Sequence, residues 1–572
     1  MRALLDILGE ELKRAFREAG YDDSRVGVTI SNRPDLCEYQ CNGAMALAKE
    51  AHKAPFEIAE EVVVKLEGSQ YFEKTECVKP GFINLNISDD YLASYIAEEA
   101  GHKKYGFENV HKDRVIVDYG GPNVAKPLHI GHLRAAIIGE AVKRLSKYVG
   151  NDTSGDIHMG DWGLQIGLII AEMKERGMDR MPTLDELSDI YPVASAKSKE
   201  NDEFKERAMG ITYDLQHGNE EYLSIWRHIM DISVADLKEN YNKLNVSFEI
   251  WKGESDADPY IADMVDRMKK DGYAYESQGA LVVDVSEDTD AKEIPPCMIL
   301  KSDGAALYTT TDLATLVQRE EDYKPDSVIY VVDKRQEMHF LQVFRTAKKC
   351  GIVPGETALE FLGFGTMNGK DGKPFKTRSG GVMRLQELID DVYERCLDRM
   401  KDNGAEMSGD ELEDTAGKIG LAAIKYGDLS NEARKDYIFD IDKFTSFEGN
   451  TGPYILYTIV RIKSILRKYG ENGGKEGTKI LPAANPSEKS LMMTLAGFAP
   501  MIEGAWRDLA PHRICAYIYQ VANDFNKFYH ETKIISEEDK DKQGSWISLL
   551  ILTKGILETC IDILGFEAPE KM

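Results

Sequence analysis

The sequence predicts an α/β protein whose largest domain is a doubly wound, Rossmann-like parallel sheet, and two features carry that prediction. The apolar run Arg114–Tyr119 is typical of a buried parallel strand. From Leu133 to Val149, apolar residues recur at helical spacing among good helix formers. A strand therefore turns into the first helix of the fold over the short stretch between them. Further strands of this nucleotide fold are predicted at 280–283, 327–332 and 359–362.

We expect three domains along the 572 residues. Residues 1–106 have the pattern of a small α/β domain. Residues 107–404 carry the parallel sheet, interrupted at about 168–283 by a polar and largely helical insertion. Residues 405–572 have helical periodicity almost throughout, which predicts an all-α bundle.

The chain is acidic, with a formal net charge of −27 and an isoelectric point near 5.0. This charge argues against indiscriminate binding to nucleic acids but leaves room for a specific RNA partner met by local basic patches. The eight cysteines include no C-x-x-C pair, so we expect free thiols in a reducing cytoplasm and no protein-bound metal.

The most apolar late stretch, 546–566, is interrupted by Lys554, Glu558 and Asp562. It therefore predicts a core helix rather than a membrane span. We expect a cytoplasmic protein that contacts no membrane and works as a monomer.

The stretch His129-Ile130-Gly131-His132 lies at the predicted start of the first helix. Free backbone N–H groups at a helix start favour phosphate, and Gly131 lets the backbone approach a ligand closely. The imidazoles of His129 and His132 can donate hydrogen bonds to charge that develops on a phosphate. A short His-x-Gly-His pattern also occurs by chance, but the strand before it, the helix after it and Lys126 nearby favour a phosphate site.

The longer string from Pro122 to Leu133, Pro-Asn-Val-Ala-Lys-Pro-Leu-His-Ile-Gly-His-Leu, resembles the nucleotide-binding signature of class I aminoacyl-tRNA synthetases. The resemblance is to the arginyl-tRNA synthetase family in particular, and further matches run from about Pro34 to the last residue. It implies that L-arginine is activated with ATP to arginyl-adenylate and transferred to the 3′ end of tRNA-Arg, with activation dependent on tRNA. Mg²⁺ is expected to arrive with ATP.

The resemblance implies four catalytic residues: Lys126, His129, His132 and Lys376. Lys376 lies in the glycine-rich, cationic loop 369–381, which resembles the mobile signature loop of the class; a solvated basic turn is the alternative. Ser379 stands where the second lysine of that loop would be, and the family lysine that Lys126 matches is thought to substitute for it. The implied ATP contacts are His129, Gly131, His132, Lys376 and His339. His339 is equally open to interpretation as a structural helix residue.

Recognition of arginine requires carboxylates, because they hold a planar guanidinium in bidentate geometry. Asp118 ends the first predicted strand at its carboxyl edge, where ligands bind in this fold. Tyr308 and Asp312 resemble the family's arginine-binding Tyr-x-x-x-Asp and share a face if helical; a helix cap with a core tyrosine is the alternative. Asn123 and Gln336 are expected at the α-amino and carboxylate ends of the substrate.

The expected tRNA contacts lie near both ends of the chain. Asn42 belongs to a stretch that resembles the family's added N-terminal domain, which touches the D-loop corner of tRNA; otherwise Asn42 caps the following helix. Tyr457 and Arg461 share a helical face and can stack on and hold unpaired bases. Tyr529 and Met572 are placed like further anticodon contacts of the family, although a tyrosine at helical spacing is more often a core residue.

Other functions fit parts of the sequence. A different nucleotidyl-transferring enzyme with the same histidine pair would make a small-molecule adenylate, but such enzymes usually lack an RNA-binding bundle. A degenerate, synthetase-like RNA-binding protein would be favoured by the loss of His129, His132 or Asp312, and all three are present. A different class I specificity is disfavoured because the pair Asp118 and Asp312 suits a cationic amino acid.

Overall fold

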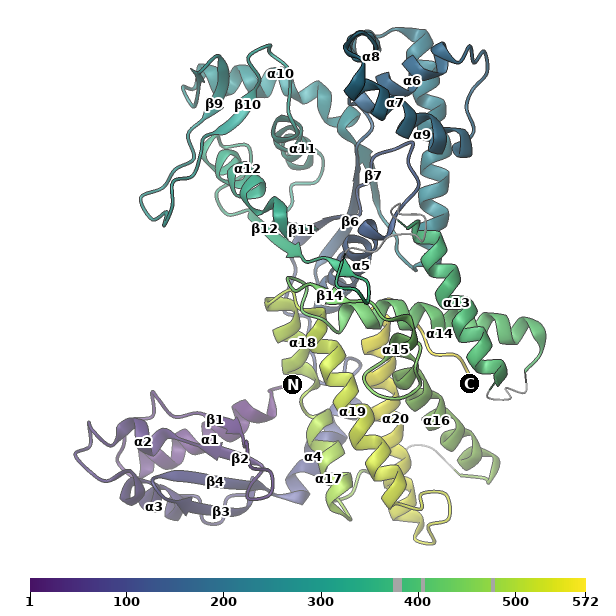
Figure 1. Ribbon diagram of the computed structural model, residues 1–572. Coiled ribbons are helices and arrows are strands. Elements are labelled where there is room, and N and C mark those ends of the chain that lie inside the picture. Colours follow the sequence, from purple (N-terminus) through teal and green to yellow (C-terminus); the bar gives the residue numbers. More distant parts are fainter. Residues whose placement is uncertain (374–382, 403–406, 475–478) are drawn as a thin grey trace.

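The computed structural model describes residues 1–373, 383–402, 407–474 and 479–572, and the chain forms three parts (Figure 1). The N-terminal part is an antiparallel sheet with strand order β1-β2-β4-β3. Its elements are α1 (Leu4–Glu18), β1 (Val28–Ile30), β2 (Tyr39–Cys41), α2 (Gly43–Leu47), α3 (Pro55–Lys65), β3 (Phe72–Val78) and β4 (Phe82–Ile87). Helix α4 (Asp89–Gly101) leads away from this sheet and lies beside helix α17 (Pro486–Leu495) of the C-terminal part.

The central part is a five-stranded parallel sheet in the order β12-β11-β5-β6-β7. Its strands are β5 (Arg114–Tyr119), β6 (Asp152–Met159), β7 (Ile250–Gly253), β11 (Ser327–Asp333) and β12 (Ala358–Phe364). Helices pack on both faces, the chief ones being α5 (Leu133–Val149), α10 (Glu254–Lys270), α11 (Tyr308–Asp322) and α12 (Glu337–Lys349).

Neighbouring residues of β5 enter two separate hydrophobic cores. Val117 shares one core with Ile137 of α5, whereas Ile116 shares the other with Leu313 of α11. Side chains alternate across a strand, so a strand covered on both faces is apolar throughout. The doubly wound parallel sheet is thereby confirmed.

Four helices stand between β6 and β7 in the chain: α6 (Leu164–Glu175), α7 (Leu184–Glu200), α8 (Asp202–Gln216) and α9 (Glu220–Lys243). The chain then returns to the central sheet at β7, inside the range 168–283 that we expected to be an insertion. That edge strand has only four residues, too short for a clear pattern.

The strand expected at 280–283 exists but joins a different sheet. It pairs antiparallel with β8 (Ala274–Ser277) and β10 (Cys297–Leu300). Gln278 and Gly279, between β8 and β9 (Ala280–Val283), both have positive φ, 52° and 83°. Such a two-residue turn folds β9 back onto β8, so the expectation that 280–283 continues the parallel sheet is wrong.

The C-terminal part is helical, as expected, apart from the short parallel pair β13 (Met367–Asn368) and β14 (Tyr437–Ile438). Its helices are α13 (Leu385–Asp402), α14 (Gly409–Leu429), α15 (Ile441–Phe444), α16 (Gly452–Glu471), α17 (Pro486–Leu495), α18 (Phe498–Arg507), α19 (Pro511–Glu531) and α20 (Lys540–Ile563). Across the described ranges, no helix has the length and apolar character needed to cross a membrane.

A buried ion pair joins the bundle to the central part. Arg134, in the first turn of α5, donates to Asp428 of α14 at 3.0 Å, and the Tyr437 hydroxyl donates to the same carboxylate oxygen at 2.9 Å. Arg134 also donates to the carbonyl of Gly365, at the end of β12, at 2.7 Å. The helix that follows the histidine motif is therefore fixed against both the bundle and the sheet.

Candidate functional site

A cavity of about 330 Å³ opens at the carboxyl edge of the parallel sheet, where ligands bind in folds of this type. Residues far apart in the sequence meet there. Of the residues predicted for the site, the cavity is lined by Asp118, Gly131, His132, Tyr308, Asp312, Gln336 and His339. His129, Lys126 and Asn123 stand outside the lining, and Lys376 lies outside the described residues.

The two histidines of the motif are held in one tautomer by the backbone. The N–H of Gly131 donates to Nδ1 of His129 at 3.0 Å, and the N–H of His129 donates to Nδ1 of His132 at 3.1 Å. Since Nδ1 accepts in both rings, the proton of each neutral ring lies on Nε2. Both rings thus keep an N–H donor for a ligand.

Burial keeps these histidines neutral. It lowers the pKa of His132 to about 3, helped by the neighbouring His129, and the ring centroids are 4.0 Å apart. Burial and Lys126 also lower the pKa of His129. A side chain on Gly131 would collide with the His129 ring, because its Cβ would lie 2.7 Å from Cε1. The motif therefore supplies neutral hydrogen-bond donors in a fixed arrangement.

The chain on either side of the motif is tied to the segment that follows residues 374–382. The N–H of Ile130 donates to the carbonyl of Met383 at 3.1 Å, and the N–H of Leu385 donates to the carbonyl of Leu128 at 2.9 Å. The chain that follows the second predicted phosphate element is therefore hydrogen-bonded to the histidine motif. The Lys376 prediction itself falls in the range that the structure leaves undescribed.

Lys126 is directed to a neighbouring helix. Its Nζ lies 4.1 Å from the ring centroid of Tyr191 in α7, a cation–π contact. Its effect on the histidine pKa nevertheless places its charge near the motif.

Asn123 is fixed by a close approach of two loops. The N–H of Val124 donates to the carbonyl of Gly160 at 3.0 Å, and the N–H of Gly160 donates to the carbonyl of Pro122 at 3.1 Å. A Cβ on Gly160 would lie 2.0 Å from Oδ1 of Asn123. Gly160 is thus required for this position of the Asn123 side chain.

The two predicted arginine-binding carboxylates have different partners. Asp118 accepts from the Arg319 guanidinium at 2.5 Å, and the same buried Arg319 pairs with Asp156 at 2.7 Å. Asp312 is 2.5 Å from Nε2 of His339 and has no arginine partner among the described residues. Asp312 is therefore the carboxylate better able to accept a cationic ligand.

Tyr308 and Asp312 stand on the first turns of α11, and Tyr308 is 72% exposed. The alternative of a core tyrosine is therefore wrong. An exposed ring beside a carboxylate is a suitable surface for a planar guanidinium.

Glu254 lies near the predicted arginine-binding carboxylate Asp312 but was not predicted from the sequence as a site residue. It begins α10 directly after β7, and burial together with the charges of Asp161 and Asp312 raises its pKa to about 7. Glu254 in turn contributes to the raised pKa of Tyr308. The signal was a strand followed by a helix start with a glutamate, Gly253-Glu254, but it is visible only once β7 is recognised.

The residues predicted for tRNA contact lie in two distant places. On the bundle, Arg461 stacks over Tyr457 at 4.7 Å and over Tyr529 at 5.4 Å, measured to the ring centroids. Tyr457 is 40% exposed, which disfavours its interpretation as core. Met572 packs against the hydrophobic core of the bundle. In the N-terminal part, Asn42 is exposed and occupies the cap position of α2, but its side chain accepts no capping hydrogen bond.

Within the described ranges, no group of three or more His, Cys, Asp or Glu side chains is arranged to hold a metal ion.

Comparison with known families agrees with this architecture. The chain matches the tRNA synthetases class I (R) catalytic domain over residues 97–441, the DALR anticodon binding domain over 455–572, and the arginyl tRNA synthetase N terminal domain over 2–87. Fold and site together define a class I aminoacyl-tRNA synthetase.

Similarity to individual proteins identifies the family within this class. The chain is 57% identical to the arginine–tRNA ligase of Agathobacter rectalis and 51% identical to that of Alkaliphilus oremlandii, with 100% of both chains covered in each case. The crystal structure of arginyl-tRNA synthetase from Plasmodium falciparum has a TM-score of 0.83 at 25% identity, again over 100% of both chains. The chain belongs to the arginyl-tRNA synthetase family.

Proposed function

We propose that this chain is an arginine–tRNA ligase, which activates L-arginine with ATP and transfers it to the 3′ end of tRNA-Arg. One observation carries the proposal: a single cavity joins His132, a neutral donor at a helix start, to the carboxylate of Asp312. The first element suits a phosphate and the second a guanidinium. Full-length similarity to arginine–tRNA ligases supports the same reaction.

In the first step, a carboxylate oxygen of arginine attacks the α-phosphorus of ATP. The bond from that phosphorus to the bridging oxygen breaks, and pyrophosphate leaves with the electron pair. His129 and His132 donate from Nε2 to the oxygens on which charge increases. In the second step, a hydroxyl of the terminal ribose of tRNA attacks the carbonyl carbon of the adenylate. The bond from that carbon to the phosphate oxygen breaks, AMP leaves with the electron pair, and the hydroxyl proton is released.

The arginine side chain would lie between Tyr308 and Asp312. Glu254 would act near Asp312, whose charge helps to raise its pKa. Asp118 would act only indirectly, because its carboxylate already pairs with Arg319. Asn123 and Gln336 would bind the α-amino and carboxylate groups. An aromatic ring beside an available carboxylate favours arginine over neutral amino acids.

The phosphates of ATP would contact Gly131, His339 and the two lysines, Lys126 and Lys376. Lys126 must leave the Tyr191 ring to reach them, and it would substitute for the lysine absent at Ser379. Mg²⁺ would enter with ATP as part of the substrate.

The tRNA would contact Asn42 in domain 1–106 and the residues Tyr457, Arg461, Tyr529 and Met572 in domain 405–572, with chemistry in domain 107–404. Activation of arginine would depend on this contact. We also propose that the protein acts as a monomer in the cytoplasm, where its eight free cysteines would stay reduced.

The test is ATP–pyrophosphate exchange with a panel of amino acids, with and without tRNA-Arg. Exchange with arginine alone, appearing when tRNA is added, is the expected result. Exchange with another amino acid would overturn the substrate assignment. Absence of exchange in folded protein that still binds tRNA would instead indicate an RNA-binding protein without catalysis.

A further inference from the structure

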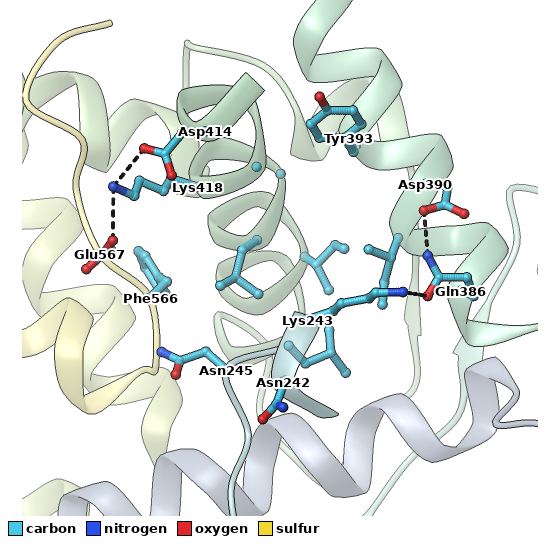
Figure 2. A pocket seen from close by; sticks show the side chains of 16 residues that line it. Asn242, Lys243, Asn245, Gln386, Asp390, Tyr393, Asp414, Lys418, Phe566 and Glu567 are labelled. Atoms are coloured by element: carbon cyan, nitrogen blue, oxygen red, sulfur yellow. Dashed lines mark hydrogen bonds and ion pairs between the residues drawn. The ribbon is translucent and has the colours of Figure 1, made fainter. Parts of the chain in front are cut away.

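A second and larger cavity, of about 700 Å³, lies away from the substrate site (Figure 2). It forms where the end of α9 meets the facing sides of α13 and α14 and the C-terminal tail at Phe566 and Glu567. No role proposed above uses this cavity. Its volume falls in the range of sites for small organic molecules.

The floor of this cavity is apolar and incompletely filled. Leu244 and Phe566 are buried, but Ile389 and Leu421 remain partly exposed. At Gly417 of α14 there is open space, because a Cβ built there meets no atom within 4 Å. An apolar ligand body would cover these aliphatic groups and gain free energy from the area removed from water.

At one end of the rim, a lysine is paired with two carboxylates. Lys418 pairs with Asp414 at 3.0 Å and with Glu567 at 3.1 Å, as Figure 2 shows. Its ammonium is therefore already neutralised and attracts an anionic ligand weakly.

The opposite end of the rim carries a carboxylate, Asp390, without a cationic partner in the described part of the chain. The cation nearby, Lys243, is already engaged, because it donates to Gln386 at 2.9 Å and pairs with Glu239 at 2.9 Å. Asp390 accepts from the amide of Gln386 at 2.6 Å, and among the described residues it pairs with no cation. Helix α9 also ends at this cavity, and the C-terminal end of a helix favours positive charge.

We propose that this cavity binds a small organic cation, an amine or guanidine carried on an apolar ring or chain. The cation lies at Asp390, and the apolar body lies over Gly417 and Leu421. The rim has three carboxylates against two ammonium groups, so anionic ligands of the same shape are disfavoured.

Occupation of the cavity would reach the substrate site through one residue. Tyr241, directly before the lining residue Asn242, donates its hydroxyl to the carbonyl of Gly120 at 2.5 Å, and Gly120 lines the substrate cavity. A changed KM for arginine when the cation is bound is therefore expected. This consequence rests on the proposed function, whereas the binding itself does not.

The experiment uses three indoles that share one ring and differ in charge: tryptamine, tryptophol and indole-3-propionate. Binding to the full chain is measured by titration calorimetry without ATP, arginine or tRNA, so failure here is distinct from failure of the ligase assay. We expect one tryptamine per chain, weaker binding of tryptophol and none of the propionate. Absence of tryptamine binding, or equal binding of all three, would overturn the proposal.

Two variants locate the site. Gly417→Leu fills the cavity and should reduce tryptamine affinity at least about tenfold; Gly210→Leu, at an equally open helical glycine in α8, should leave it unchanged. Asp390→Asn should reduce the affinity about two- to fivefold, since the lost ion pair is exposed. If Gly417→Leu unfolds, Asp390→Asn decides alone. Unchanged affinity in the folded variants would place the ligand elsewhere and overturn the proposal.

Discussion

The two walls of the substrate cavity each present an aspartate, but the protein uses these groups differently. On the sheet side, Asp118 and Asp156 share the buried guanidinium of Arg319. On the helix side, Asp312 contacts His339 and has no arginine or lysine partner among the described residues. Glu254, whose pKa the Asp312 charge helps to raise, also has no such partner in those residues. One wall is an internal ion-pair network, and the other is available to a ligand. Carboxylates that face one cavity are therefore not equivalent, because their protein partners decide which can still bind a ligand.

The largest effect is expected when the ion-pair network of Asp118, Arg319 and Asp156 is broken. Arg319→Met leaves the buried Asp156 and the partly buried Asp118 without a cation, which should lower the free energy of unfolding by about 3–5 kcal/mol. Denaturant unfolding measures this loss. As a matched control, Arg345→Met removes a more exposed pair with Asp290 and should cost about 1 kcal/mol or less. Equal losses in the two variants would mean that burial does not distinguish the Arg319 network.

The next effect tests the open wall. Asp312→Asn should weaken arginine binding by about 2–5 kcal/mol, because a desolvated guanidinium loses its charge partner. Arginine affinity is measured by calorimetry or from the KM of exchange. Asp322→Asn, at the far end of the same helix and paired with Lys252, should leave affinity intact. Near-normal affinity in Asp312→Asn would remove this residue from the arginine pocket.

Glu254 should make the open wall dependent on pH. Its pKa is raised from 4.5 to about 7, so the folded protein retains a proton that the unfolded chain has released. This raised pKa contributes stability that is complete below about pH 4.5 and is lost as the pH rises through about 7. Glu254→Gln should therefore be more stable than the parent at about pH 8, by at most about 3 kcal/mol.

The same titration should appear in binding. A guanidinium prefers the ionised carboxylate, so arginine affinity of the parent chain should rise from about pH 6 to about pH 8. Glu254→Gln should lack that rise. Parallel affinity profiles in the two proteins would show that Glu254 does not face the ligand.

The smallest effect lies outside the cavity and sharpens the comparison. Tyr457→Ala should weaken tRNA binding by about 1–3 kcal/mol, the range for loss of one base stack. It should leave ATP and arginine affinity unchanged, unlike the cavity variants. Tyr457→Phe keeps the ring and should behave like the parent in a filter-binding assay. Unchanged tRNA affinity in Tyr457→Ala would exclude this face of α16 from the contact.

Contacts between neighbours in the chain could be predicted. His129, Gly131 and His132 lie within four residues of one another, and their hydrogen bonds are made with their own backbone. Periodicity identified β5 and α5 because a strand buried on both faces is apolar without interruption. The helical bundle was predicted because its apolar residues recur at helical spacing.

Contacts between residues far apart in the chain could not be predicted from the sequence. Asp118 and Arg319 are 201 positions apart, and nothing local indicates that this aspartate already has an arginine partner. The four-residue strand β7 was not predicted, so Glu254, which follows it directly, was not identified as a site residue. The strand at 280–283 was predicted but assigned to the wrong sheet. Short strands carry little periodicity, and their pairing depends on turns such as Gln278-Gly279.

The amino-acid sequence by itself thus determined the fold class, the family and the histidine motif, because these depend on local pattern and on contiguous residues. Only the tertiary structure decided which carboxylate of the substrate cavity is open. The raised pKa of Glu254 and the second cavity beside Gly417 also depend on the tertiary structure. The physical reason is that desolvation and ion pairing depend on which groups surround a side chain, and those groups come from every part of the chain.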